Sequence, residues 1–321
     1  MLQILSITGP IYIAIALGWL STRLGLFERA DMRVLGKFVL YLALPALLFG
    51  AVSQRPVADI LDWRYLAVYA LGGLLTMALA LLWFRRVARQ APALAVVQSM
   101  GCMCPNSGFV GYPINLLLLG APLAGVVLGM SMLVENLLWL PLLLALLDNA
   151  GGSGHWRRVL RSVAAGLVRN PLVIGLAAGL LAALLGLRLP AAGERTVALF
   201  AQSSAALSLF VIGGSLGGLQ VRGLWTQVLQ IAVGKLLIHP VMALAMLALL
   251  AALGAPLHEP GLRTAVVLVS ACPIFGIYPI LAQRANQEGL AAAALLGTTV
   301  ASFFSISGLL VLLHHGPVWL G

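Results

Sequence analysis

A few polar and ionisable side chains interrupt long apolar runs in this chain. Glu135, followed by Asn136, lies near the middle of one run, and Lys235 lies well inside another, with His239 one turn further on. An ionisable group inside a bilayer is costly to bury, so each of these residues is a functional hypothesis. Glu135 is expected to carry a proton or to hydrogen-bond a ligand. Lys235 is expected to balance the charge of an anion or of Glu135.

Each of these residues also has a purely structural interpretation. Glu135 can form a hydrogen bond that only joins two neighbouring helices, and Lys235 can extend its ammonium group to the cytoplasmic interface. His239 precedes Pro240 and can satisfy the helix break that this proline causes. The sequence leaves both interpretations open for all three residues.

Two apolar runs each contain a pair of prolines, Pro105 with Pro113 and Pro273 with Pro279. Proline removes a backbone donor and clashes with the preceding turn, so each pair is expected to open its helix near the middle. Backbone groups freed inside a membrane must be satisfied by protein, water or a ligand. The new half-helix N-termini carry partial positive charge, which suits a carboxylate. The paired breaks therefore predict a site for an organic anion.

The stretch between the first two prolines supplies side chains for such a site. Asn106 and Ser107 are expected in the opened part, where they can hydrogen-bond a ligand, and Gly111 lies between the two prolines. The predicted substrate-binding residues are Asn106, Ser107, Gly111, Glu135, Asn136 and Lys235. Glu135 and His239 are the candidates for proton coupling.

The composition requires lipid as the solvent for most of the surface. Hydrophobic residues make up 61% of the 321 residues and charged residues only 9%, against about 25% charged in soluble domains. This excludes a soluble enzyme, a disordered chain and a nucleic-acid-binding domain. The net charge of +10 comes mostly from arginines between apolar runs, where they indicate topology rather than nucleic-acid binding.

Ten apolar segments are predicted to be membrane helices, in an all-α membrane protein. They are about 3–22, 34–53, 64–84, 94–119, 123–147, 166–186, 195–219, 224–253, 262–284 and 290–313. Most arginines lie in the loops after the odd-numbered segments, so these loops are expected in the cytoplasm. Both termini are then expected on the non-cytoplasmic side of a bacterial inner membrane.

The two halves of the chain resemble each other. Pro10 and Gly18 match Pro171 and Gly179 in one ungapped alignment, and a Cys-Pro pair precedes each of the two predicted breaks. Each half contains an odd number of segments, so the halves are expected to insert with opposite orientation. Inverted repeats with paired broken helices are typical of secondary transporters.

The predicted domains follow this repeat. Residues 1–148 form the first five-helix repeat, 149–165 a flexible Gly-rich cytoplasmic linker, and 166–321 the second repeat. Cys102, Cys104 and Cys272 lie inside apolar runs, without the spacing of a disulfide framework or a zinc site. We therefore expect no metal, no cofactor and no enzymatic activity.

Several stretches resemble the auxin efflux carrier family. Pro105–Pro113 (PNSGFVGYP) is similar to its helix 4 motif and Cys272–Arg284 (CPIFGIYPILAQR) to its helix 9 motif, and Leu44–Phe49 and Arg169–Pro171 are further similar stretches. The resemblance covers essentially the whole chain. The short linker is closer to the compact bacterial carriers, some of which take malonate or malate, than to plant members with a long loop.

This resemblance implies a 5+5 inverted repeat of ten helices, in which helices 4 and 9 cross at Pro105 and Pro273. It also implies a scaffold of helices 1, 2, 6 and 7, which forms a homodimer, and a transport unit of helices 3–5 and 8–10, which moves like an elevator. Asn106 would be the helix 4 ligand. Glu135 occupies a helix 5 position that is glutamine in plant members, and Lys235 resembles a basic helix 8 position.

Together these features predict a secondary-active transporter of a small organic anion, a mono- or dicarboxylate such as malonate or malate, driven by protons or by the substrate gradient. One alternative is a sodium-coupled carrier of the bile-acid type. Another is a membrane sensor or assembly subunit that binds a carboxylate without transporting it. An intramembrane enzyme has the least support, because no catalytic constellation is visible.

Overall fold

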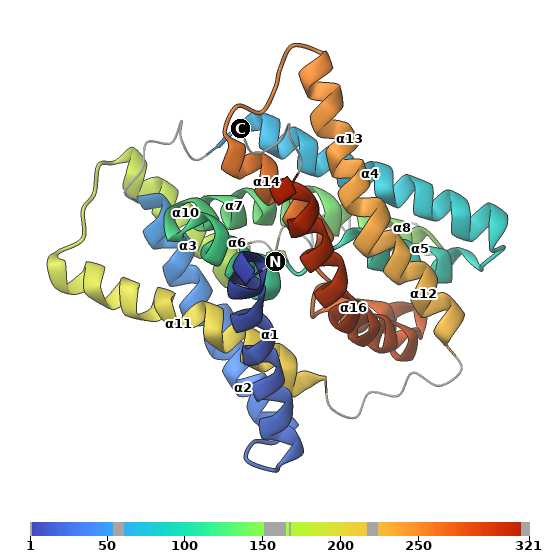
Figure 1. The fold of residues 1–321 in the computed structure, drawn as a ribbon, viewed down its shortest axis with the longest axis horizontal. Helices are drawn as coiled ribbons and strands as arrows, with labels where there is room; N and C mark the ends of the chain where they lie inside the picture. Colours follow the sequence, from blue (N-terminus) through green and yellow to red (C-terminus); the bar gives the residue numbers. More distant parts are fainter. Residues whose placement is uncertain (1, 54–60, 151–164, 167, 217–223, 316–321) are drawn as a thin grey trace. The chain divides into compact units, whose positions relative to one another are not determined.

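The computed structural model describes residues 2–53, 61–150, 165–166, 168–216 and 224–315 (Figure 1). Almost all of these residues are helical, and the one β-bridge among them joins Pro105 and Ile274 in antiparallel fashion. The predicted all-helical class is confirmed for the described part of the chain. Most of the predicted linker 149–165 lies outside the described residues.

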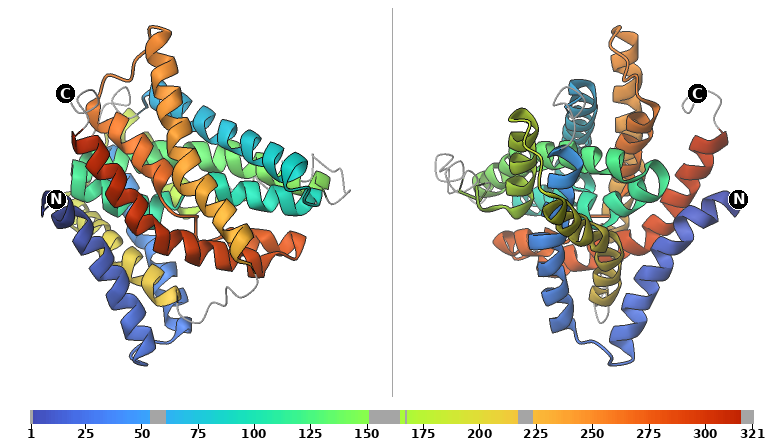
Figure 2. Two further views of the ribbon diagram at one scale, coloured as in Figure 1. Left: turned by 45° about the vertical axis from the view of Figure 1, so that its right-hand side comes forward. Right: turned by 90° about the vertical axis from the view of Figure 1, so that its left-hand side faces the viewer.

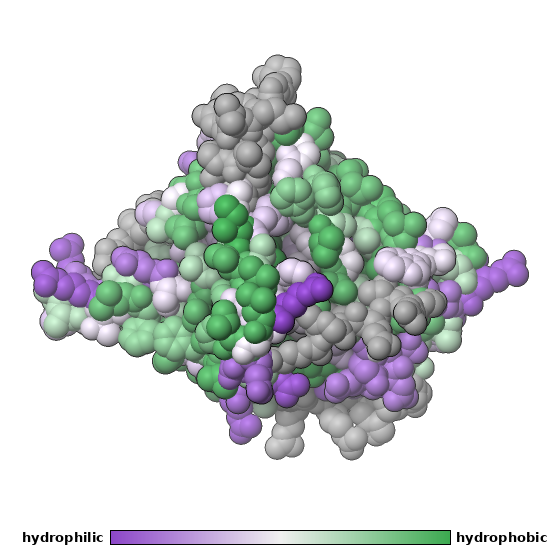
Figure 3. All heavy atoms as spheres, turned by 60° about the horizontal axis from the view of Figure 1, so that its bottom comes forward, coloured by the Kyte–Doolittle hydropathy of each residue, from purple (hydrophilic) through white to green (hydrophobic). Residues whose placement is uncertain are grey.

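Six helical stretches are long and apolar enough to cross a membrane. They are Ala30–Ser53, Trp63–Val87, Ala121–Ala150, Ala191–Ser215, Trp225–Ala252 and Glu288–Leu313. Large hydrophobic side chains are exposed on them, such as Leu199 (69%) and Phe304 (71%), and hydrophobic residues cover much of the face in Figure 3. A surface of this kind requires lipid, so the chain is a multi-pass membrane protein. The count of ten spans and the inverted repeat stay predictions.

The remaining apolar helices are shorter, and four of them come from the two predicted segments that contain paired prolines. The fourth segment is divided into Pro92–Met103 and Ser107–Leu119. The ninth segment is divided into Pro260–Ala271 and Tyr278–Ala282. Both predicted segments are therefore interrupted in the structure.

The chain divides into two compact units. Unit 1 comprises Met1–Trp63, Ser107–Leu133 and Leu167–Gly218, and unit 2 comprises Arg64–Asn106, Val134–Gly166 and Leu219–Gly321. The described helices of unit 1 are α1 (Leu2–Arg23), α2 (Arg29–Phe38), η1 (Val39–Ala43), α3 (Leu44–Ser53), η4 (Ser107–Gly111), α6 (Tyr112–Leu119), most of α7 (Ala121–Val134), α10 (Pro171–Leu184) and α11 (Ala191–Ser215).

Two helix pairs in unit 1 approach each other through glycines. Helix α1 lies beside α11, and α10 lies beside α3 (Figures 1 and 2). A Cβ on Gly18 of α1 would collide with the Phe210 carbonyl group of α11. A Cβ on Gly179 of α10 would lie 3.0 Å from the Phe49 carbonyl oxygen of α3. Because Phe49 and Phe210 are as far apart in the chain as Gly18 and Gly179, the two contacts correspond under the alignment of the two halves.

The hydrophobic core of unit 1 fills the space around α3. Leucines 44, 47 and 48 of α3 pack with Tyr112 of α6, with Leu128 of α7 and with Leu172 and Leu176 of α10. Gly125 of α7 leaves room for the side chain of Ala51. Small residues thus bring the backbones together, and leucines fill the remaining volume.

Unit 2 contains the first half of the interrupted fourth segment, both halves of the ninth, and helices that pack against them. Its elements are α4 (Trp63–Leu82), η3 (Trp83–Val87), α5 (Pro92–Met103), η5 (Glu135–Trp139), α8 (Leu140–Ala150), α12 (Trp225–Val233), η6 (Gly234–Ile238), α13 (His239–Ala252), α14 (Pro260–Ala271), α15 (Tyr278–Ala282), η7 (Gln283–Ala285) and α16 (Glu288–His315). Helices α12, η6 and α13 continue one another as a single long helix, orange in Figure 2.

Short π-helical turns occur inside several of the long helices of both units. In unit 2, η5 begins at Glu135 and η6 contains Lys235. A π-turn widens the helix locally and changes the direction of side chains, and such turns are frequent at functional sites. Both ionisable residues that the sequence singled out in apolar runs therefore lie in turns of irregular geometry.

Candidate functional site

The interrupted helices of unit 2 meet at their unwound stretches. The Asn106 N–H donates to the Pro273 carbonyl oxygen at 2.8 Å, and the Phe275 N–H donates to the Cys104 carbonyl oxygen at 3.3 Å. Between these bonds, Pro105 and Ile274 form the antiparallel bridge. We call this arrangement the crossover. It joins two segments that are far apart in the sequence through main-chain groups alone.

The crossover fits the chemistry of its prolines. Pro105 and Ile274 form the pair that exchanges no hydrogen bonds, so the missing N–H of Pro105 costs nothing there. Pro273 accepts from Asn106 but has no N–H to donate in return, so the ladder ends at this point. The Ile274 N–H is instead satisfied by Thr298 Oγ1 of α16, at 3.4 Å. Two bonds therefore hold the crossover without a sheet extending from it.

The extent of the opened stretches differs from the sequence prediction. Ser107 is not in an unwound segment, because it begins the π-turn η4, in which it is buried. Pro113 and Pro279 do not open their helices either. Pro113 lies where the π-turn η4 continues into α6, and Pro279 lies in the first turn of α15. The first turn has no partner for its N–H groups, so proline is tolerated there. Only the first proline of each pair coincides with a break.

Lys235 is fully buried, with 0% of its surface exposed. Its Nζ donates to the Ser270 carbonyl oxygen at 2.6 Å and lies 2.9 Å from His239 Nδ1. Ser270 lies in the last turn of α14, just before the break at Pro273. The interpretation that Lys235 extends to the membrane interface is therefore wrong. Its ammonium group lies inside unit 2, close to the end of an interrupted helix.

The carboxylate of Glu135 is held from α4. The Tyr69 hydroxyl, on a fully buried side chain, donates to Glu135 Oε1 at 2.6 Å. Glu135 is only partly buried, so its carboxylate retains access to groups beyond this bond. The contact joins two helices, as the structural interpretation of Glu135 expected. The same carboxyl group places either a negative charge or, when it is protonated, a proton inside unit 2.

A run of aromatic rings connects Glu135 to Lys235. The ring centroids of Tyr69 and Trp139 are 4.6 Å apart, and those of Trp139 and His239 are 5.9 Å apart in an edge-on arrangement. His239 in turn contacts Lys235. We call Lys235, His239, Trp139, Tyr69 and Glu135 the polar chain of unit 2. Each member touches the next, so the buried cation and the carboxyl group belong to one cluster.

The structure distributes the predicted site residues over both units. Unit 2 contains Pro105, Asn106, Glu135, Asn136, Lys235, His239, Pro273 and Pro279. Unit 1 contains Ser107, Gly111 and Pro113. Within unit 2 the structure brings the two breaks together, and it joins Glu135, His239 and Lys235 in the polar chain. The roles of all these residues in substrate binding and proton coupling stay predictions.

Several polar groups in unit 2 were missed by the sequence analysis. Tyr69 and Trp139 link the ionisable residues, and Thr298 supports the crossover. Gln98 of α5 is fully buried, and neither of its amide atoms has a hydrogen-bond partner among the described residues. Gln98 could have been predicted from the sequence, because it is a polar amide inside an apolar segment. The aromatic residues gave no signal, because they are ordinary in membrane helices.

The cysteines of unit 2 are free and buried. Cys102 Sγ donates to the Ile231 carbonyl oxygen at 3.8 Å, and Cys272 Sγ donates to the Leu268 carbonyl oxygen at 3.3 Å. No group of three or more His, Cys, Asp or Glu residues in the described part of the chain is arranged to hold a metal ion. The cysteines therefore act as packing residues, with weak bonds to helix carbonyl groups.

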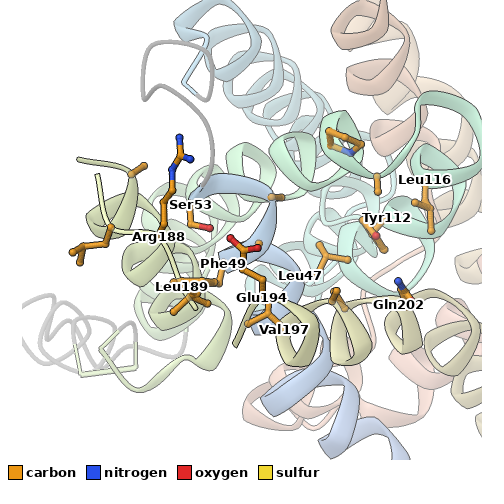
Figure 4. A pocket seen from close by; sticks show the side chains of 18 of the residues that line it. Leu47, Phe49, Ser53, Tyr112, Leu116, Arg188, Leu189, Glu194, Val197 and Gln202 are labelled. Carbon is orange, nitrogen blue, oxygen red and sulfur yellow. The ribbon is translucent and has the colours of Figure 1, made fainter. Parts of the chain in front are cut away.

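Unit 1 contains a separate pocket of about 990 Å³, lined by α3, α6, α7, α11 and the end of α10 (Figure 4). Arg188, Glu194, Gln202 and Tyr112 are polar residues among an otherwise mostly apolar lining. None of the predicted site residues lines this pocket. This cavity of unit 1 is thus lined by residues other than those that the sequence singled out.

Comparison with known proteins identifies the family. Residues 8–310 match the family described as "Membrane transport protein". The chain is 30% identical over 324 aligned positions to a protein of Rhizobium meliloti (strain 1021) named "Putative malonate transporter", covering 99% of this chain and 98% of that protein. It is also 25% identical over 207 positions to "Uncharacterized transporter YfdV" of Escherichia coli (strain K12), covering 64% of this chain and 66% of that protein. These matches indicate a membrane transporter rather than an enzyme. The chain belongs to the membrane transport protein family, which is that of the auxin efflux carriers.

Proposed function

We propose that the protein is a secondary-active transporter that carries a small organic anion, a mono- or dicarboxylate such as malonate, across the bacterial inner membrane. The observation that carries the proposal is the crossover of two interrupted helices with a fully buried ammonium group beside it, bonded to the end of α14. Unwound helices next to a buried charge are the usual construction of substrate sites in secondary transporters. The printed name of the Rhizobium relative supports malonate as the first anion to test.

Lys235 is the proposed counter-charge for the anion. Among the described residues, it is the one Lys, Arg, Asp or Glu side chain that is buried. A single buried cation can neutralise a single carboxylate, and an uncompensated second charge in a membrane is costly. Asn106 and Asn136, which also belong to unit 2, are proposed to supply hydrogen bonds to the same ligand.

Glu135 is proposed to carry the coupling proton, and His239 is the second candidate. Glu135 is the only acidic residue of the polar chain, and it is held by Tyr69 at 2.6 Å. When Glu135 is protonated, the ammonium group of Lys235 balances the charge of a bound monoanion, such as a singly protonated malonate. Unloading the proton then weakens anion binding by like-charge repulsion.

The proposed architecture is a pair of inverted five-helix repeats, 1–148 and 166–321. The corresponding glycine contacts of Gly18 and Gly179 support this repeat. Helices 1, 2, 6 and 7 would form a dimeric scaffold, and helices 3–5 and 8–10 would move the substrate like an elevator. Both termini would lie on the non-cytoplasmic side.

Counterflow in proteoliposomes tests the function. Vesicles loaded with unlabelled malonate should accumulate external radiolabelled malonate when they contain the wild-type protein. Asn106→Ala should abolish most of this uptake because it removes the side-chain amide that is proposed to bind the anion, and Pro273→Ala should do so because it allows the helix to continue through the break. Pro190→Ala, at the exposed start of α11 in unit 1, is the control and should transport normally.

Three further arms separate the alternatives. Uptake that requires an imposed sodium gradient would support the bile-acid type of carrier instead. Uptake that follows an imposed pH gradient supports proton coupling. Tight malonate binding to the purified protein without counterflow would support a sensor, and wild-type uptake rates in both crossover variants would show that the proposed site is wrong.

A further inference from the structure

Two buried N–H groups of the polar chain have no acceptor. Trp139 Nε1 and His239 Nε2 are buried and have no hydrogen-bond partner among the described residues. Both side chains are 0% exposed. The desolvation of a buried polar atom destabilises the protein when no hydrogen bond compensates for it. Two such atoms on neighbouring rings therefore call for a shared explanation.

The hydrogen bonds of Lys235 define the proton position on His239. A lysine ammonium group has only donors, and one of its N–H groups points to the Ser270 carbonyl oxygen. His239 Nδ1, 2.9 Å from Nζ, must therefore accept from Lys235. A neutral imidazole that accepts at Nδ1 carries its proton on Nε2. His239 Nε2 is thus an N–H donor, as Trp139 Nε1 always is.

The indole ring of Trp139 is held rigidly. The edge of the indole ring occupies the space beside Gly73 of α4 where a Cβ atom would otherwise lie. Tyr69 packs on the ring at 4.6 Å between centroids. His239 is likewise fixed by Lys235. Two donors on immobilised rings lose little entropy when they bind an acceptor, which makes a preorganised site.

We propose that Trp139 Nε1–H and His239 Nε2–H form, next to the Lys235 ammonium group, a carboxylate subsite of unit 2. Both of its unpartnered atoms are N–H donors beside a cation, so the subsite selects a group that has only acceptors, such as a carboxylate. It rests on the proposed function and extends it, because it assigns the carboxylate end of the anion to helices 5 and 8 rather than to the crossover. Trp139 is thereby a specificity-determining residue that the sequence analysis did not single out.

The test compares two conservative variants with a matched control. Trp139→Phe keeps an aromatic ring beside Tyr69 but removes the N–H. His239→Asn keeps an amide acceptor for Lys235 near the position of Nδ1 and removes the second donor. Trp83→Phe in η3, whose side chain is 48% exposed, removes an indole N–H outside the polar chain. All variants are purified as full chains, and malonate affinity is measured by thermal shift and KM by counterflow.

We expect Trp139→Phe and His239→Asn each to weaken malonate affinity about tenfold, as loss of one hydrogen bond to a charged group does. Trp83→Phe should leave it unchanged. The double variant should lose less than the product of the two single losses, because both donors serve one carboxylate. Acetate should show the same pattern, and chloride should show none.

Several outcomes overturn the subsite. Unchanged affinity in Trp139→Phe would mean that the indole N–H binds no carboxylate, and that the rings only pack against each other. Independent losses in the double variant would place the donors on different partners, and an effect on chloride alone would assign the subsite to a halide. If Trp139→Phe transports with unchanged KM, the subsite fails and the transporter remains. If the wild-type protein shows no carboxylate counterflow, the proposed function fails and the subsite with it.

Discussion

In unit 1, the serines of α11 donate to carbonyl groups of their own helix, whereas unit 2 also contains buried polar side chains that bond across helices. Ser204 donates to the Ala201 carbonyl oxygen at 2.6 Å, and Ser208 to the Ser204 carbonyl oxygen at 2.5 Å. In unit 2, Lys235 reaches Ser270 on α14, and Tyr278 reaches the Val97 carbonyl oxygen on α5 at 2.9 Å. Local bonds survive when helices slide, but cross-helix bonds must break.

The same contrast holds for the way that helices approach each other. Glycines of unit 1 contact main-chain carbonyl groups of the opposite helix, and such contacts leave no space for adjustment. Unit 2 also has close glycine contacts, and several of them accommodate side chains, such as Trp139 at Gly73 and Tyr278 at Gly101. In unit 1, close main-chain contacts therefore hold α1 against α11 and α10 against α3. Unit 2 uses close packing to position chemical groups.

The largest expected effect tests whether the chemistry belongs to unit 2. Lys235→Met removes the buried ammonium group and keeps a side chain of similar length. We expect malonate counterflow to fall by roughly a hundredfold or more, because the anion loses its counter-charge. The folded protein should persist, since a buried charge is replaced by an apolar group.

The chain offers a direct control for this variant. Its second lysine, Lys37, is exposed on α2 in unit 1. Lys37→Met should leave both counterflow and thermal stability unchanged. Equal losses in the two variants would remove the distinction between the units.

A second test concerns the rigid packing of unit 1. A Cβ on Gly213 of α11 would collide with the Ile15 carbonyl group of α1. Gly213→Ala should therefore destabilise the protein by about 1–3 kcal/mol through overpacking, measured as a lower melting temperature in detergent. Gly308→Ala on α16 is the control, because nothing lies within 4 Å of its Cβ position, and it should be neutral or slightly stabilising. A stable Gly213→Ala protein would show that the α1–α11 contact is soft.

A third test concerns the proton on Glu135. Glu135→Gln keeps an oxygen acceptor for Tyr69 but cannot take up a proton. At the pH where malonate uptake is fastest, the uptake rate should change by only several-fold. The dependence of uptake on an imposed pH gradient should be lost. The neighbouring titratable groups Tyr69, Lys235 and His239 are unchanged in this variant. A pH dependence identical to that of the wild type would transfer the coupling role to another residue.

The smallest expected effect concerns the pocket of unit 1. Gln202→Leu alters a polar group of its lining without touching the polar chain. Malonate counterflow should stay within about twofold of wild type, since a surface substitution away from a site has little effect. A large loss of malonate affinity would place a substrate contact in unit 1 and weaken the contrast between the units.

Those parts of the fold that depend on strong local rules were predictable from the sequence. Pro105 and Pro273 interrupt their helices because proline cannot continue a helix whose previous turn is formed. The same reasoning went too far for Pro279, which lies in a first turn, and for Pro113, which lies where a π-turn continues into an α-helix. Ser107 was misplaced because the helix resumes immediately after Asn106.

The candidate site was only partly predictable. Lys235 and Glu135 stood out because charge is rare in this composition, and the structure places them in one cluster. Tyr69 and Trp139, which connect them, are indistinguishable in sequence from residues that face lipid. Their role depends on which side of a helix faces a neighbour, and the π-turns η5 and η6 shift that side in a way that helical periodicity does not encode.

The crossover has a consequence for how such carriers diversify. Its two hydrogen bonds run between main-chain atoms, from Asn106 to Pro273 and from Phe275 to Cys104. Neither of these two bonds involves a side chain. Mutations can therefore replace the groups that line the site, and with them the cargo, while the frame that brings them together is inherited unchanged.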